Sequence, residues 1–301
     1  MPPDPLNIHI NLVALQATFF RRLQHQLDVT KVLQVGCDQV SAEQVAEQHE
    51  FGMFMPANGA QLKHEDAKAE AQDWLLRGFL RDAIEGTGLF LDECLQICEV
   101  MPVAVKGSAK GAELHRLFHE LSLTNHRLHL PQKLEKLERQ FGIATRFNAN
   151  VLSLNKARTC VVHRLGAVSA LDVDETGALR LTFQHAKFVA RGQNTGEELV
   201  IDRPGIVTTE DSMLELYFVE NERVFQLGER VRLEAHELYD TIITLWRFGM
   251  AAAQALEAYG RSIGIQLPPP PGVKEGHLSA LPQLYVEAVE KLKMQNSHTH
   301  K

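Results

Sequence analysis

The chain has 301 residues, 45% of them hydrophobic, which is enough to bury a sizeable core as one large domain or one domain with added segments. Its formal net charge of -7 argues against binding to nucleic acid through bulk positive charge, so an RNA site would have to be a local basic patch. The first residues lack the basic segment of a signal peptide, and the apolar stretch from Leu12 to Phe20 is about half a membrane span. With four cysteines that we expect to stay reduced, these features predict a cytoplasmic protein without membrane association.

Residues 1–66 are predicted to form an N-terminal helical extension. Apolar spacing indicates one helix from Asn11 to Leu27 and another from Ser41 to His49, with Ser41 suited to cap the second. Glycine, proline and asparagine residues indicate a loop over 51–66.

Residues 67–265 are predicted to form a helical core. Apolar residues at three-and-four spacing indicate a long helix from Ala67 to Met101, which Gly86 and Gly88 are expected to kink or break. Further helical stretches are expected over 112–141 with a break at Pro131, over 148–163, and over 234–262.

Before the last of these helices, the pattern changes to the alternation that is typical of strands. Leu179, Leu181 and Phe183 alternate with polar residues, and turn residues occur at 174–177 and 193–196. We therefore predict a small antiparallel sheet over about 168–233, with further strands over 198–201, 214–219 and 223–227.

The segment 266–301 begins with a proline-rich linker at 268–272, and a short helix is expected over 280–293 before a polar tail. The fold class predicted for the whole chain is mainly α, a helical bundle with a small antiparallel β insertion, α+β overall.

The predicted helix over 148–163 carries an arginine in its apolar face. At about 100° per residue, Arg158 lies within an apolar arc of about 140° that includes Leu154, while His163 points nearly opposite Leu154. An arginine in such a position needs a partner. One interpretation is a structural ion pair with an acidic residue of the long helix, Asp82, Glu85 or Asp92. A second is a guanidinium that extends from the apolar face to solvent. The third is an arginine held at a groove to bind phosphate.

The context of this arginine resembles the signature of the HEPN superfamily. In that signature, an arginine late in a small helical bundle is followed after four to six residues by a histidine. Arg158 and His163 match it within the segment LNKARTCVVHRLG, as do the apolar pair before the histidine, Arg164 and Gly166. Thr159 stands where the family commonly has Asn, Asp or His. The resemblance covers residues 67–262, with the sheet as an insertion before the final helix.

The resemblance implies a metal-independent endoribonuclease without a cofactor, which acts on RNA as a homodimer in a bacterial defence or toxin–antitoxin system. An antitoxin or another defence-system component would be a further partner. His163 would take the proton of the RNA 2′-hydroxyl and Arg158 would hold the phosphate. The residues expected to support catalysis and bind RNA are Thr159, Lys156, Arg164 and Arg146. The alternative is a catalytically inactive HEPN-like module for binding or regulation, which Thr159 and the acidic net charge favour.

Two other groups of residues have simpler interpretations. His115 and His119 are four apart on a predicted helix and could form a metal pair, but no further ligand follows at the usual spacing, which favours a solvated role. Cys160 lies three residues before His163, yet its apolar neighbours favour a packed thiol over a nucleophile.

Overall fold

The computed structural model describes residues 10–47, 62–107, 111–202 and 205–265. The helices within these ranges are α1 (Leu12–Gln39), α2 (Ala42–Glu47), α3 (His64–Lys106), α4 (Ala112–His126), α5 (Leu130–Phe141), α6 (Asn148–Arg164) and α7 (Ala235–Ser262). The strands are β1 (Ala178–Gly192), β2 (Glu198–Ile201) and β3 (Ser212–Gln226). Of the loop predicted over 51–66, residues 51–61 lie outside the described residues, and residues 64–66 belong to α3 instead. The proline-rich linker and the predicted helix at 280–293 also lie outside the described residues.

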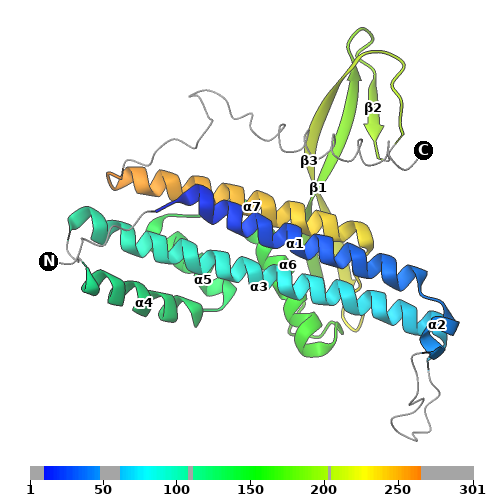
Figure 1. The fold of residues 1–301 in the computed structure, drawn as a ribbon, viewed down its shortest axis with the longest axis horizontal. Coiled ribbons are helices and arrows are strands. Elements are labelled where there is room, and N and C mark those ends of the chain that lie inside the picture. The colour runs from blue at the N-terminus through cyan, green and yellow to red at the C-terminus, as the bar shows by residue number, and fades with distance from the viewer. Residues whose placement is uncertain (1–9, 48–61, 108–110, 203–204, 266–301) are drawn as a thin grey trace, which may run out of the picture. The chain divides into compact units, whose positions relative to one another are not determined.

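The long helices α1, α3 and α7 lie side by side, and α5 and α6 pack against α3 (Figure 1). This arrangement confirms for α3, α5, α6 and α7 that the predicted helices share one hydrophobic core, whereas α4 contributes no residue to it. The apolar face of each core helix needs a buried partner. Of the helices in the described ranges, none is long and apolar enough to cross a membrane.

Helix α1 belongs to the same core, although the sequence analysis assigned its residues to an N-terminal extension. It continues past the expected end to Gln39, and it buries Leu15, Phe19, Leu23 and Leu27, which recur every fourth residue on one face. The ring of Phe19 stacks on that of Phe90 in α3, with the centroids 4.4 Å apart.

Helix α3 runs without interruption from His64 to Lys106, so the prediction that Gly86 and Gly88 break it is wrong. A glycine inside a helix costs only about 1 kcal/mol relative to alanine. Packing against α1, α4, α5, α6 and α7 outweighs that cost.

The helical stretch predicted over 112–141 is interrupted, as expected, and forms α4 and α5. The break falls at 127–129, before Pro131, which lies in the first turn of α5. Proline is tolerated there because that amide has no acceptor within the helix. The backbone N–H of His129 donates to Oε1 of Gln132 at 2.9 Å and caps the start of α5.

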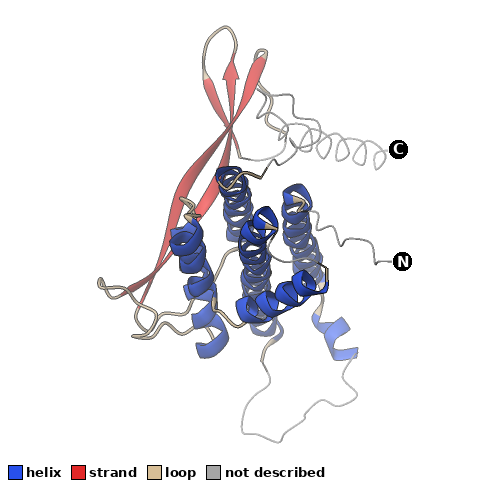
Figure 2. Ribbon diagram, turned by 90° about the vertical axis from the view of Figure 1, so that its left-hand side faces the viewer, coloured by secondary structure: helices blue, strands red, loops and turns tan. Residues whose placement is uncertain are grey.

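The strands form an antiparallel sheet in the order β2-β1-β3, which confirms the predicted small sheet. β1 and β3 pair along their whole length, from Ala178 opposite Gln226 to Gly192 opposite Ser212. The two strands predicted over 214–219 and 223–227 are therefore one strand, because β1 offers a partner to every residue between them. One half of this ladder packs on α6 and α7, and the other half extends away from the helices (Figures 1 and 2).

Candidate active-site groove

A groove of about 640 Å³ lies between α3, α5 and α6. It brings together Arg158, Thr159 and His163, three of the residues that the sequence analysis singled out. These residues of α6 line one side of the groove, while residues of α3, the end of α4, the connection at 127–129 and α5 form the remainder. The predicted arginine and histidine therefore share one accessible surface.

Arg158 is paired within this groove. Its Nη2 donates to Oε1 of Glu85 on α3 at 2.7 Å. The Arg158 side chain is 24% exposed and that of Glu85 is 54% exposed, so the pair lies at the edge of the groove and not in the core. The buried Nε of Arg158 has no hydrogen-bond acceptor among the described residues. The guanidinium thus has an N–H group without an acceptor among the described residues, and its ion pair with the partly exposed Glu85 is weakened by solvent.

His163 lies in the last turn of α6 and is exposed. In the part of the chain that the structure describes, its ring forms no hydrogen bond or ion pair, so the imidazole is available to a ligand. Thr159, between the two, donates its hydroxyl to the backbone oxygen of Asn155 at 2.9 Å. The threonine hydroxyl can therefore accept a hydrogen bond from a ligand but does not have a free proton to give.

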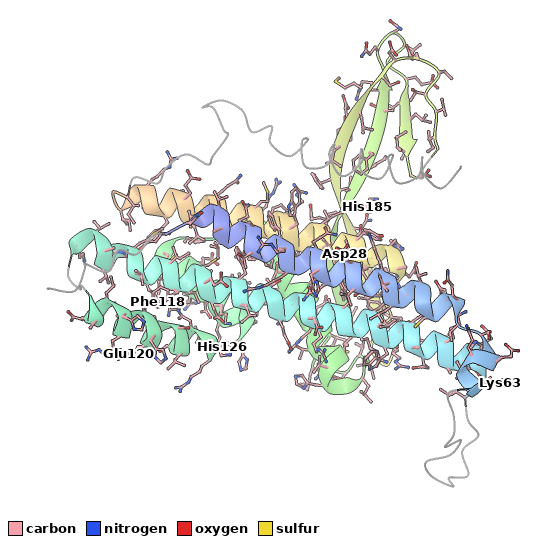
Figure 3. The ribbon with its side chains drawn as sticks, viewed as in Figure 1. Asp28, Lys63, Phe118, Glu120, His126 and His185 are labelled. Atoms are coloured by element: carbon pink, nitrogen blue, oxygen red, sulfur yellow. The ribbon has the colours of Figure 1, made fainter. Side chains whose placement is uncertain are left out.

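The groove also contains Asp92, which the sequence suggested only as a partner for Arg158, and Lys133, which sequence reasoning missed. Asp92 of α3 binds Nζ of Lys133 at 2.7 Å and lies 3.3 Å from Nδ1 of His126. Lys133 in addition donates to the backbone oxygen of Gly88 at 3.1 Å. His126 lies at the end of α4, on the side of α3 (Figure 3). Acidic and basic groups alternate here, so the groove is not a strongly basic surface.

The structure places Arg164 outside the groove. Its Nε donates to Oδ2 of Asp172 at 2.8 Å, and Asp172 also accepts from the amide and the hydroxyl of Ser169. Burial by itself would raise the pKa of the Asp172 carboxyl, but the Arg164 guanidinium and the Ser169 donors outweigh it, and the pKa is lowered. This ion pair anchors the turn after α6, in which Leu165 adopts a left-handed φ of 52°.

Lys156 and Arg146 also lie away from the groove. Nζ of Lys156 is 3.4 Å from the backbone oxygen of Val173. Arg146 precedes α6 and stacks on the ring of Phe147 at 4.8 Å. Of the residues predicted to assist catalysis or bind RNA, only Thr159 therefore lines the groove with Arg158 and His163.

The remaining candidates agree with their simpler interpretations. Cys160 is buried, and its Sγ is 3.4 Å from the backbone oxygen of Ala167. Burial, helped by the nearby charge of Asp172, raises the pKa of this thiol to about 11, which disfavours the nucleophilic thiolate. His115 and His119 are exposed on α4, and no cluster of three or more His, Cys, Asp or Glu side chains within the described ranges is placed to hold a metal ion.

The resemblance to the HEPN superfamily rests on the sequence signature and is not supported by comparisons with known proteins. Models of protein families, curated proteins and solved structures were compared with this chain, and none matches.

Proposed function

We propose that the chain is a metal-independent endoribonuclease of the HEPN type, in which Arg158 and His163 act on RNA. The observation that carries the proposal is the groove between α3, α5 and α6, which holds both residues and leaves the His163 imidazole without a protein partner among the described residues. The resemblance supplies the biological setting, a bacterial defence or toxin–antitoxin system with an antitoxin or defence component as a further partner.

The chemistry needs one base and one cation. His163 in its neutral form takes the proton of a ribose 2′-hydroxyl, and that oxygen bonds to the adjacent phosphorus. The bond from phosphorus to the 5′-oxygen of the next nucleotide breaks, and that oxygen leaves with a proton from solvent or from the imidazolium. Arg158 donates hydrogen bonds to the phosphoryl oxygens and stabilises the added negative charge of the phosphorane. The products are a 2′,3′-cyclic phosphate and a 5′-hydroxyl.

The helix geometry favours a homodimer. Arg158 and His163 are five residues apart on α6, which separates them by about 7.5 Å along the axis and about 140° around it. They do not stack on one helix face. A twofold axis beside the groove would bring the arginine of one copy toward the histidine of the other, so that two copies complete each site.

The ion pair with Glu85 sets a condition on this mechanism. Arg158 has to exchange a carboxylate for a phosphate before it can act. More than half of the Glu85 side chain is exposed, and exposed ion pairs contribute at most about 1 kcal/mol, so binding of RNA can drive the exchange.

The same ion pair favours a second candidate function, a HEPN-like module that binds or regulates without catalysis. In that case the Arg158–Glu85 pair is a permanent link between α6 and α3, and His163 is an exposed residue with no chemical role. The net charge of -7 and the mixed charge of the groove agree with this alternative.

The deciding experiment compares RNA cleavage by the wild type, His163→Ala and His115→Ala, in the presence of a chelator. His115 is an exposed histidine on α4 outside the groove and serves as the matched control. We expect wild type and His115→Ala to cleave RNA with cyclic phosphate ends, and His163→Ala to be inactive. Cleavage by His163→Ala, or no cleavage by a wild type that forms dimers, would favour the binding module.

A further inference from the structure

We infer a second ligand site, for a phosphate group, formed by Arg146 and Arg247 at the N-terminal end of α6. This site is separate from the groove, because Arg158 lies about 15 Å along α6 from the first residue of the helix. It does not depend on the proposed cleavage of RNA. Its evidence is a pair of neighbouring arginines that the protein orients but does not neutralise.

Arg247 of α7 is held in a fixed orientation. Its guanidinium stacks over the ring of Phe218 at 4.1 Å and over that of Phe147 at 4.8 Å. Nη1 donates to Oε1 of Gln184 in β1. Three contacts from three elements thus restrict a side chain that would otherwise have many rotamers, and such restriction reduces the entropy lost on binding a ligand.

Arg146 brings a second positive charge to the same ring. Its guanidinium lies 4.8 Å from the centre of Phe147, the ring that Arg247 also covers. Burial and, after it, repulsion by Arg146 lower the pKa of Arg247. The exposed Arg146 therefore repels the partly buried Arg247.

No acidic side chain within the described residues forms an ion pair with either arginine. The carboxylate linked to this cluster is Glu220, and it accepts hydrogen bonds from Asn150 and from Gln184. By contrast, Arg158 and Arg164 on the same helix each have a carboxylate partner. Leaving the partly buried Arg247 without an opposite charge is costly, and an anion bound beside both arginines reduces that cost.

The start of α6 adds further donors. The N-cap residue, Phe147, has no side chain that can accept from the first helical amides. Among the described residues, no acceptor bonds to the backbone N–H of Ala149 or Asn150, and the helix dipole is positive at this end. Two guanidinium groups and a helix start match a tetrahedral phosphate, which accepts several hydrogen bonds at once, better than a single carboxylate.

The test measures binding to the full-length protein. Inorganic phosphate, a nucleoside monophosphate and a short single-stranded RNA are titrated separately against the wild type and against Arg146→Gln, Arg247→Gln and Arg139→Gln. Arg139 is an exposed arginine of α5 that forms a surface pair with Glu135, and its variant is the matched control for the loss of one charge. Arg146 is exposed, so Arg146→Gln keeps the test valid if Arg247→Gln folds poorly.

We expect each site variant to weaken binding about tenfold and the control to bind like the wild type. If the RNA binds and the small ligands do not, the phosphate belongs to a nucleic-acid backbone; if the small ligands bind, it belongs to a free phosphate or nucleotide. Equal binding of all three probes by wild type and Arg146→Gln would overturn the site. His163→Ala should keep this binding, so a failure of the proposed ribonuclease activity leaves this result unaffected.

Discussion

Arg158 of α6 and Glu85 of α3 form an ion pair at 2.7 Å across the edge of the groove that also contains His163. This contact agrees with the ion-pair interpretation of Arg158 and also with the groove interpretation, because the arginine has an acidic partner and still lines an accessible groove. Glu85 therefore competes with any phosphate that Arg158 binds.

Glu85→Gln should increase RNA cleavage, or RNA binding where cleavage is prevented by His163→Ala. The substitution removes the negative competitor and frees the guanidinium, while the loss of an exposed ion pair should lower the free energy of unfolding by less than about 1 kcal/mol. The measurements are cleavage rate, RNA affinity and urea unfolding.

Glu93→Gln is the matched control for that change, since Glu93 also lies on α3 and forms an exposed ion pair, with Arg22 at 3.3 Å. It should leave RNA binding and cleavage unchanged. A fall in cleavage in Glu85→Gln with unchanged stability would mean that Glu85 assists the reaction and does not compete with RNA.

Arg158→Ala and His163→Ala should each abolish cleavage but should differ in stability. His163 is exposed and unpaired among the described residues, so its removal should change the free energy of unfolding by no more than about 0.5 kcal/mol. The Arg158 side chain is mostly buried and paired with Glu85, so its removal should cost about 1–2 kcal/mol. Urea unfolding and analysis of product ends check both statements. A plain 3′-hydroxyl end would contradict the assigned roles, because it requires attack by water.

Asp172→Asn should destabilise the protein at neutral pH and lose its effect in acid. The pKa of Asp172 is lowered in the folded state, so its contribution to stability is fully present above the ordinary aspartate pKa of about 3.9 and is lost as the pH falls through the lowered value. The difference in free energy of unfolding between wild type and Asp172→Asn, followed by urea unfolding from pH 7 toward about pH 3, should therefore shrink. A constant difference over that range would show that the Arg164–Asp172 contact does not depend on the carboxylate charge.

Alkylation should distinguish the cysteines. Cys94, Cys98 and Cys160 are buried, and burial raises the pKa of Cys98 to about 12 and of Cys160 to about 11, whereas Cys37 is partly exposed. Iodoacetamide should modify Cys37 first in the folded protein, as measured by peptide mass spectrometry. Cys160→Ala should retain RNA cleavage. A folded but completely inactive Cys160→Ala variant would instead indicate that the thiol is a catalytic group.

The positions of the helices and strands followed from local patterns in the sequence. The apolar spacing of α6 and α7 and the alternation at Leu179, Leu181 and Phe183 located these elements, because helical and strand periodicity depend on neighbouring residues. The turn residues at 174–177 and 193–196 are likewise turns in the structure. The same local reasoning was wrong about a break at Gly86 and Gly88, where helices from distant parts of the sequence support α3.

Which side chains contact each other depended on how the helices pack. Of the three acidic residues that could pair with Arg158, packing selects Glu85, while Asp92 binds Lys133 and Asp82 lies beside Arg81. Arg158 and Glu85 are 73 residues apart in the chain, so their contact depends on the rotation and register of two packed helices. The meeting of Arg146 with Arg247 is of the same kind. Side-chain periodicity shows which face of a helix is buried, but the partner on that face is set by how the helices pack against one another.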